Sequence, residues 1–180
     1  MKRQIIAIVM LALMAFAGNA FAYQGDVTPS EAAEMVADGA FILDVRTPQE
    51  WNWVGHPGQN KVILSDGTYE GAYLEGYVLN VAYEVYHEGY SKGDVLIVNT
   101  QFVKDVERLL NKDAAIITMC RSGVRSVRAA RALGAAGFTN VYNMLTGFEG
   151  GTDNSGYRTK NGWKVDGLPY NYSGVGDYKD

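Results

Sequence analysis

The segment over residues 114–144 constrains the fold of this chain most, because it places two short apolar runs on either side of a helix-forming run. Residues 114–119 and 141–144 are apolar and bounded by polar residues or glycine, which is typical of buried strands. Residues 126–136 between them have the composition of a helix that stops at Gly137. This alternation predicts strands joined by a covering helix in an α/β sheet.

The same alternation occurs earlier in the chain. A capping box with proline at the first helical position begins at Thr28 and predicts a helix over residues 29–38. Residues 41–46 form an apolar run that ends in charge, as a buried strand does when its carboxyl end reaches a functional edge. Apolar residues at helical spacing predict a further helix after Asn99: Phe102, Val106, Leu109 and Leu110. We therefore expect a mostly parallel sheet with helices on both faces.

The N-terminus has the features of a targeting segment. Two basic residues precede an apolar run over residues 5–17, and the small residues of Ala20-Phe21-Ala22 follow. This order predicts a cleavable signal peptide over residues 1–22 and export, most simply to a bacterial periplasm. The apolar run is too short to span a bilayer comfortably, so we expect no membrane association after cleavage.

Composition limits the classes of partner. The formal net charge of the chain is −4 and becomes more negative once Lys2 and Arg3 are removed, with no basic tract left. Nucleic acids and anionic lipids are therefore poor partner candidates. The 180 residues suit one domain. The polar, Gly-rich end over residues 171–180 predicts a flexible tail.

Cys120 is the only cysteine in the chain. An unpaired thiol is at risk in an oxidising compartment, which favours a functional role over that of a small buried hydrophobic residue. Cys120 follows the strand expected over residues 114–119 and precedes the helix over 126–136. Open α/β sheets bind their ligands at this point of the topology.

Three physical effects converge on the sulfur. The loop 122–124 can curl so that successive backbone N–H groups point inward, and Gly123 supplies the conformational freedom for that curl. The helix that follows adds its positive N-terminal end. Arg121 and Arg125 add formal positive charge. Together these effects favour the thiolate form of Cys120 near neutral pH and predict a nucleophile.

The loop also resembles a known family. Residues 120–126, Cys-Arg-Ser-Gly-Val-Arg-Ser, are similar to the active-site loop of single-domain rhodaneses, the thiosulfate sulfurtransferases. The resemblance covers about residues 28–170 and implies one rhodanese-like domain with a five-stranded parallel sheet, flanked by helices. Supporting motifs appear in the family's order: Leu43-Asp44-Val45-Arg46 with Glu50-Trp51 and Gly55-His56, then 141–144 with 147–150, then Gly162-Trp163 with 167–169.

The resemblance implies a double displacement. The Cys120 thiolate takes the outer sulfur of a small anionic donor such as thiosulfate, and a thiol, cyanide or a protein then accepts that sulfur from the persulfide. No metal or organic cofactor is implied. Arg121 and Arg125 are implied to orient the donor, and Asp44 and Arg46 to brace the loop without touching substrate. The implied substrate-binding residues are Arg121, Ser122, Gly123, Val124 and Arg125, with Ser126 behind them.

Alternatives remain open. Dual-specificity phosphatases and arsenate reductases also use a Cys…Arg loop, but phosphatase loops are one residue longer than the four residues between Cys120 and Arg125. A persulfide carrier with a dedicated partner, or a protein-binding module, is also compatible. Two features depart from the family: Thr146 stands where glycine is common, and the segment 57–94 is longer than usual and rich in tyrosine. We interpret this extended segment either as an added hairpin packed on the domain edge or as a platform for a sulfur-accepting protein.

Overall fold

The computed structural model of the chain describes residues 23–58, 62–63, 69–70, 77–86 and 95–172. The expected signal peptide over residues 1–22 lies outside this range, as do residues 173–180 and much of the extended segment. None of the helices that the structure describes is both long and apolar enough to cross a membrane.

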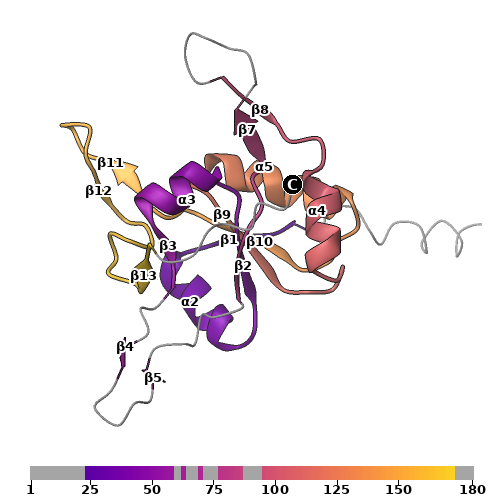
Figure 1. The fold of residues 1–180 in the computed structure, drawn as a ribbon, viewed down its shortest axis with the longest axis horizontal. Helices are drawn as coiled ribbons and strands as arrows, with labels where there is room; N and C mark the ends of the chain where they lie inside the picture. The colour runs from indigo at the N-terminus through magenta and orange to yellow at the C-terminus, as the bar shows by residue number, and fades with distance from the viewer. Residues whose placement is uncertain (1–22, 59–61, 64–68, 71–76, 87–94, 173–180) are drawn as a thin grey trace, which may run out of the picture.

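Five strands, all paired in parallel, form the central sheet (Figure 1). Their order is β1-β10-β9-β2-β6. The bounds are β1 Tyr23–Val27, β2 Phe41–Asp44, β6 Val78–Asn80, β9 Ile116–Met119 and β10 Val141–Met144. The predicted α/β fold with a five-stranded parallel sheet is confirmed, and three of the strands were expected at nearly these positions.

Edge strand β1 was not expected, because the domain was assumed to begin near residue 28. Its sequence, Tyr-Gln-Gly-Asp-Val, lacks an apolar run, and the strand pairs only with β10. An edge strand can be polar because one of its sides has no neighbour. The sheet therefore begins five residues before the expected boundary.

Four helices connect these strands: α2 Pro29–Ala37, α3 Pro48–Val54, α4 Phe102–Leu109 and α5 Val124–Ala135. The capping box predicted at Thr28 forms, since its side chain accepts from the Glu31 N–H while the Glu31 carboxylate accepts from the Thr28 N–H. A second capping box with the same Thr-Pro-x-Glu pattern starts α3 at Thr47. Helix α5 begins two residues before the expected Ser126, directly after Gly123.

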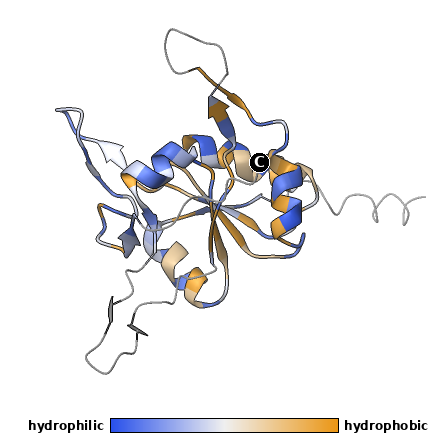
Figure 2. Ribbon diagram, viewed as in Figure 1, coloured by the Kyte–Doolittle hydropathy of each residue, from blue (hydrophilic) through white to orange (hydrophobic). Residues whose placement is uncertain are grey.

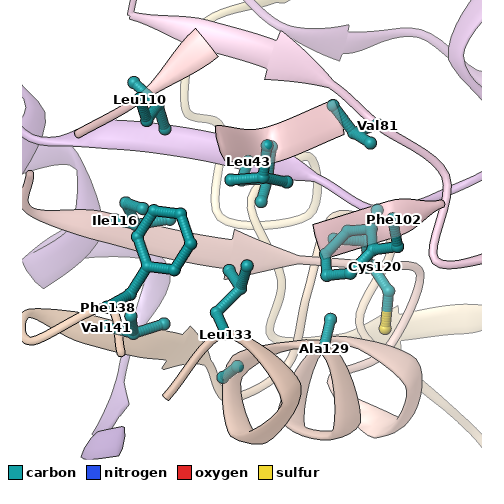
Figure 3. Packing of buried hydrophobic residues seen from close by; sticks show 13 residues of the cluster. Leu43, Val81, Phe102, Leu110, Ile116, Cys120, Ala129, Leu133, Phe138 and Val141 are labelled. Carbon is teal, nitrogen blue, oxygen red and sulfur yellow. The ribbon is translucent and has the colours of Figure 1, made fainter. Parts of the chain in front are cut away.

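The core lies on both faces of the sheet because successive strand residues point to opposite faces. Leu43 and Ile116 face α4 and α5, whereas Ile42 and Ile117 face α2 and the C-terminal segment. Hydrophobic colour accordingly concentrates on the central strands and on the inner sides of the helices in Figure 2. Figure 3 shows the hydrophobic cluster between the sheet and helices α4 and α5, with Cys120 at one end beside Ala129 of α5.

Short strand pairs surround this core: β4 Val62–Ile63 with β5 Tyr69–Glu70, β7 Glu84–Tyr86 with β8 Leu96–Val98, and β11 Gly151–Thr152 with β12 Arg158–Lys160. A fourth pair joins β3 His56–Pro57 to β13 Tyr170–Asn171. Asn171, which we expected to begin a flexible tail, is therefore held in a strand. The ring of Tyr170 also packs edge-on against Phe148, with centroids 6.0 Å apart.

The extended segment 57–94 is not wholly an addition to the domain. Its residues Val78–Asn80 form β6, the fifth strand of the central sheet, and pair with β2. Two of its tyrosines pack on the domain: Tyr77 against Phe41 at 5.5 Å between centroids, and Tyr83 edge-on against Phe102 at 5.1 Å. The positions of these two tyrosines agree with the interpretation that the segment packs on the domain edge. The role of the other residues of the segment 57–94 stays a prediction.

Candidate active site

Cys120 directly follows β9, at the carboxyl edge of the sheet, and only 1% of its surface is exposed. Its Sγ accepts two hydrogen bonds: one from the backbone N–H of Gly123 at 3.2 Å and one from the hydroxyl of Ser126 at 3.3 Å. Both donors belong to the loop and first turn of α5, so the positive end of that helix lies beside the sulfur. The sulfur is therefore bound on two sides by the segment that begins α5.

Ser126 contacts the Cys120 sulfur directly, which we did not expect. The sequence interpretation placed it behind the loop, but its buried hydroxyl donates to Sγ itself. Its backbone carbonyl also accepts from the hydroxyl of Thr118 on β9 at 3.0 Å, which ties the first turn of α5 to the sheet.

The loop turns at Gly123, which has φ +93°. A side chain at this position would overlap the backbone carbonyl oxygen of Leu145 and lie 3.0 Å from its carbonyl carbon. Gly123 therefore serves two needs at once: a left-handed backbone conformation and close approach of the segment after β10. This is the conformational freedom predicted from the sequence.

The segment after β10 clamps the loop from outside. The N–H of Phe148 donates to the carbonyl of Cys120 at 2.8 Å, and the N–H of Glu149 donates to the carbonyl of Arg121 at 2.9 Å. Gly147, with φ +63°, lies so close that a Cβ there would meet the Cys120 carbonyl oxygen and the Ser122 nitrogen. The backbone of the loop is thus hydrogen-bonded to a second segment.

Arg125 is held by a carboxylate. Its guanidinium donates two hydrogen bonds to Glu50 of α3, at 2.8 and 2.5 Å. Burial alone would lower the pKa of Arg125, but the hydrogen bonds and charge of Glu50 outweigh it and raise that pKa. For Glu50, burial would raise the pKa, yet the same ion pair and the Thr47 N–H hold it below the ordinary value. The pair is therefore charged on both sides and couples α3 to the loop.

Three further arginines are also paired. Arg121, half exposed, lies 3.4 Å from Glu149, and Arg158 approaches the same carboxylate at 3.8 Å. Arg128 on α5 forms an ion pair with Glu84 of β7 at 2.7 Å. This pair links α5 to the segment after β6.

Asp44 and Arg46 form a fully buried ion pair at the carboxyl end of β2. Arg46 also donates to the carbonyl of Gly55 at 2.7 Å, and its guanidinium lies 4.3 Å from the ring centre of Phe148. Phe148 is the residue whose N–H binds the Cys120 carbonyl. Phe148 therefore contacts both Arg46 and the loop, and the bracing role that the family resemblance implies for Asp44 and Arg46 stays a prediction.

His56 packs against Trp51 of α3. Its ring stacks on Trp51 at 3.8 Å between centroids, and its Nδ1 is 3.0 Å from the carbonyl of Pro57. This arrangement is that of a packed, hydrogen-bonded histidine. Within the ranges that the structure describes, no group of three or more His, Cys, Asp or Glu side chains is placed to hold a metal ion.

Comparison with known proteins agrees with this geometry. Residues 28–154 match the rhodanese-like domain. The chain belongs to the rhodanese-like domain family. The domain is 31% identical over 140 residues to the uncharacterized protein RP600 of Rickettsia prowazekii, covering 75% of this chain and 85% of that protein. It is 31% identical to thiosulfate sulfurtransferase 18 of Arabidopsis thaliana, covering 72% and 79%.

A solved structure shares the fold of this rhodanese-like domain. The crystal structure of Rv0390 from M. tuberculosis superposes with a TM-score of 0.65 at 33% identity, covering 84% of this chain and 99% of that one. The family and the architecture are therefore established.

Sequence reasoning missed two acidic members of the rhodanese-like site. Glu50 and Glu149 lie within the sequence motifs, and the structure shows that both pair with loop arginines. No sequence signal marks Glu50. The Thr-Pro-x-Glu pattern occurs at both Thr28 and Thr47, and only the tertiary structure brings Glu50 to Arg125.

Proposed function

We propose that this protein is a sulfurtransferase that moves a sulfane sulfur from a small anionic donor, such as thiosulfate, to a thiophilic acceptor. The observation that carries the proposal is the environment of the only cysteine: its sulfur accepts from the Gly123 N–H and the Ser126 hydroxyl at the N-terminus of α5. Donors aimed at one sulfur stabilise a thiolate and, after loading, the charge of a persulfide.

The proposed cycle has two displacements. The Cys120 thiolate attacks the outer sulfur of thiosulfate, a new S–S bond forms, and the old S–S bond breaks with its electron pair leaving on sulfite. The Cys120 persulfide then gives its outer sulfur to cyanide, a thiol or a protein acceptor, and the thiolate returns. The cycle is balanced without a redox partner, metal or organic cofactor. Its kinetics are ping-pong.

Mass spectrometry of the intact protein after exposure to thiosulfate tests this proposal. We expect a gain of one sulfur atom on the peptide that contains Cys120, and its removal by cyanide with formation of thiocyanate. Cys120→Ser should show neither event while keeping its circular dichroism spectrum, because a hydroxyl cannot form a persulfide. A loaded protein whose sulfur cyanide cannot remove would indicate a carrier for a dedicated protein partner.

The rival phosphatase chemistry requires a wider loop. Because only four residues separate Cys120 from Arg125, one fewer than in phosphatase loops, we expect no appreciable hydrolysis of an aryl phosphate. Rapid hydrolysis together with no sulfur loading would favour the phosphatase class instead.

The compartment is part of the same proposal. The charged, apolar and small-residue order of residues 1–22 supports export to the periplasm. Fractionation of cells that express the full chain, with N-terminal sequencing of the product, should find a periplasmic protein that starts near Tyr23.

A further inference from the structure

The first turn of α5 is not capped as α2 and α3 are. Gly123 stands at its N-cap position and offers no side chain, whereas Thr28 and Thr47 cap the two earlier helices. The same turn carries the Ser126 hydroxyl, which donates to the Cys120 sulfur at 3.3 Å. A helix end without a side-chain cap is less firmly held. The distance from Ser126 to the sulfur therefore depends on other contacts of this turn.

Thr118 of β9 supplies such a contact. It is fully buried, and it shares a strand face with Ile116, which packs against α5, because alternate residues of a strand point to the same side. Its Oγ1 lies 3.0 Å from the carbonyl oxygen of Ser126 and 3.0 Å from that of Tyr142 on β10. A hydroxyl has a single proton, so the two carbonyls share one donor. Thr118 thus joins three elements, two residues before Cys120.

Burial alone does not require a hydroxyl at position 118. Valine is branched in the same way, suits a buried strand equally well, and would need no hydrogen-bond partner among apolar residues. The helix does not require the hydroxyl either, because the Ser126 carbonyl lies within α5, where carbonyls accept from the N–H four residues later. The bond from Thr118 is therefore additional to the helix, and it fixes where the backbone of Ser126 lies relative to the sheet.

We propose, building on the proposed sulfurtransferase function, that Thr118 is a positioning residue: its hydroxyl holds the first turn of α5 so that the Ser126 hydroxyl stays within hydrogen-bond distance of the Cys120 sulfur. Thr118 acts through Ser126 and takes no part in making or breaking bonds. The Ser126 hydroxyl stabilises negative charge on the sulfur, and that stabilisation weakens as the hydrogen bond lengthens or bends. The rate of sulfur loading therefore depends on a side chain inside the sheet.

Thr118→Val tests this inference by removing the hydroxyl and keeping the branched shape. A methyl carbon ordinarily stays about 3.3 Å or more from a carbonyl oxygen, so the Ser126 carbonyl must move away from its present 3.0 Å. With thiosulfate as donor and cyanide as acceptor, kcat/KM for the donor reports the loading step. We expect it to fall about five-fold, as in Ser126→Ala, because the same hydrogen bond to the sulfur is lost. An unchanged kcat/KM overturns the inference.

The double variant separates two routes by which the Thr118 hydroxyl can act. If it acts through Ser126, the Ser126 hydroxyl is already out of place in Thr118→Val, and adding Ser126→Ala should slow loading by less than about two-fold more. If it acts instead through the Tyr142 carbonyl and the segment after β10, the two losses multiply to about twenty-five-fold. The first result supports the inference, and the second overturns it.

Two further variants show whether the hydroxyl at this position is what matters. Thr118→Ser keeps the donor and should stay within about two-fold of the wild type; a variant as slow as Thr118→Val would overturn the inference. Thr139→Val is the matched control, because Thr139 also donates to a backbone carbonyl, that of Lys112, but is exposed and precedes β10, away from the carboxyl edge. It should load within about two-fold of the wild-type rate. A five-fold fall there as well would show that the effect is not specific to Thr118.

Far-UV circular dichroism checks that each variant is folded. If Thr118→Val does not fold, Thr118→Ala takes its place in the same comparison with Ser126→Ala, because it removes the hydroxyl without placing a methyl group against the Ser126 carbonyl. The outcomes for the two proposals differ. Failure of the wild type to load sulfur on Cys120 contradicts the proposed sulfurtransferase function, and this inference falls with it. Normal loading of the wild type, with losses that multiply in the double variant, overturns this inference alone.

Discussion

Replacing Gly123 with alanine separates backbone strain from the packing that shapes the loop. At φ +93° an alanine is strained by about 1–2 kcal/mol. Its Cβ would also overlap the Leu145 carbonyl oxygen. No rotamer relieves a clash between backbone atoms, so the loop or the segment after β10 must move, at a further cost of about 1–3 kcal/mol. We expect Gly123→Ala to lower the free energy of unfolding by about 2–5 kcal/mol.

Gly137→Ala provides the matched control. Gly137 has almost the same φ, +92°, but no heavy atom within 4 Å of the Cβ position. It should therefore lose only the strain component, about 1–2 kcal/mol. Urea denaturation of the two variants, followed by far-UV circular dichroism, measures the difference. Equal losses would refute the claim that contact with Leu145 requires glycine at position 123.

The same pair of variants tests the role of the loop in chemistry. The Gly123 N–H donates to the Cys120 sulfur at 3.2 Å, and any shift of the loop weakens that bond. Losing one hydrogen bond to a charged sulfur should slow loading from thiosulfate about ten-fold in Gly123→Ala. Gly137→Ala should load at the wild-type rate. Equal rates in all three proteins would show that this N–H does not stabilise the reacting sulfur.

Three further predictions concern the surroundings of the loop. Arg46→Met leaves the carboxylate of Asp44 buried without its partner and should cost about 3–5 kcal/mol in urea denaturation; a loss below about 1 kcal/mol would contradict it. Ser126→Ala removes a hydroxyl donor to the sulfur and should slow loading several-fold, with kcat/KM as the measure; an unchanged rate would remove Ser126 from the site. Burial raises the pKa of Glu50, but Arg125 and the Thr47 N–H lower it below its unfolded value, so their interaction stabilises the fold above about pH 4.5 and is lost as the pH falls through the folded-state pKa. Unfolding free energies of the wild type and Glu50→Gln should therefore converge between about pH 6 and about pH 3, and a constant difference would contradict this linkage.

Sequence patterns predicted well two kinds of element: those stabilised by residues close together in the chain, and those buried along their whole length. Strands β2, β9 and β10 consist largely of residues with no exposed surface, so their apolar runs are visible without any tertiary information. The N-terminus of α2 is encoded in four consecutive residues. The position of Cys120 follows from the order of β9 and α5 alone.

The elements that were missed depend on distant partners. Glu50 and Arg125 are 75 residues apart, and nothing near either residue specifies that α3 packs beside the loop. Strand β1 exists because β10 offers it a hydrogen-bonding edge, not because its own sequence favours a strand. In the sequence Asn171 is the first residue of a polar tail, but β3 gives its backbone a partner.

The size of the loop is therefore determined by the segments that pack around it at the carboxyl edge of the sheet. Phe148 and Glu149 hydrogen-bond to the carbonyls of Cys120 and Arg121, while Gly147 and the Leu145 carbonyl lie against the loop where a Cβ would not fit. An additional loop residue would have to displace this segment, which is itself held by the buried Arg46 through Phe148. Inserting a residue is therefore not enough to widen the loop for a tetrahedral anion. The segment after β10, which is hydrogen-bonded to the loop, must also move. This arrangement supports the proposed chemistry at a single sulfur atom over phosphoryl transfer, for a reason that lies outside the loop sequence.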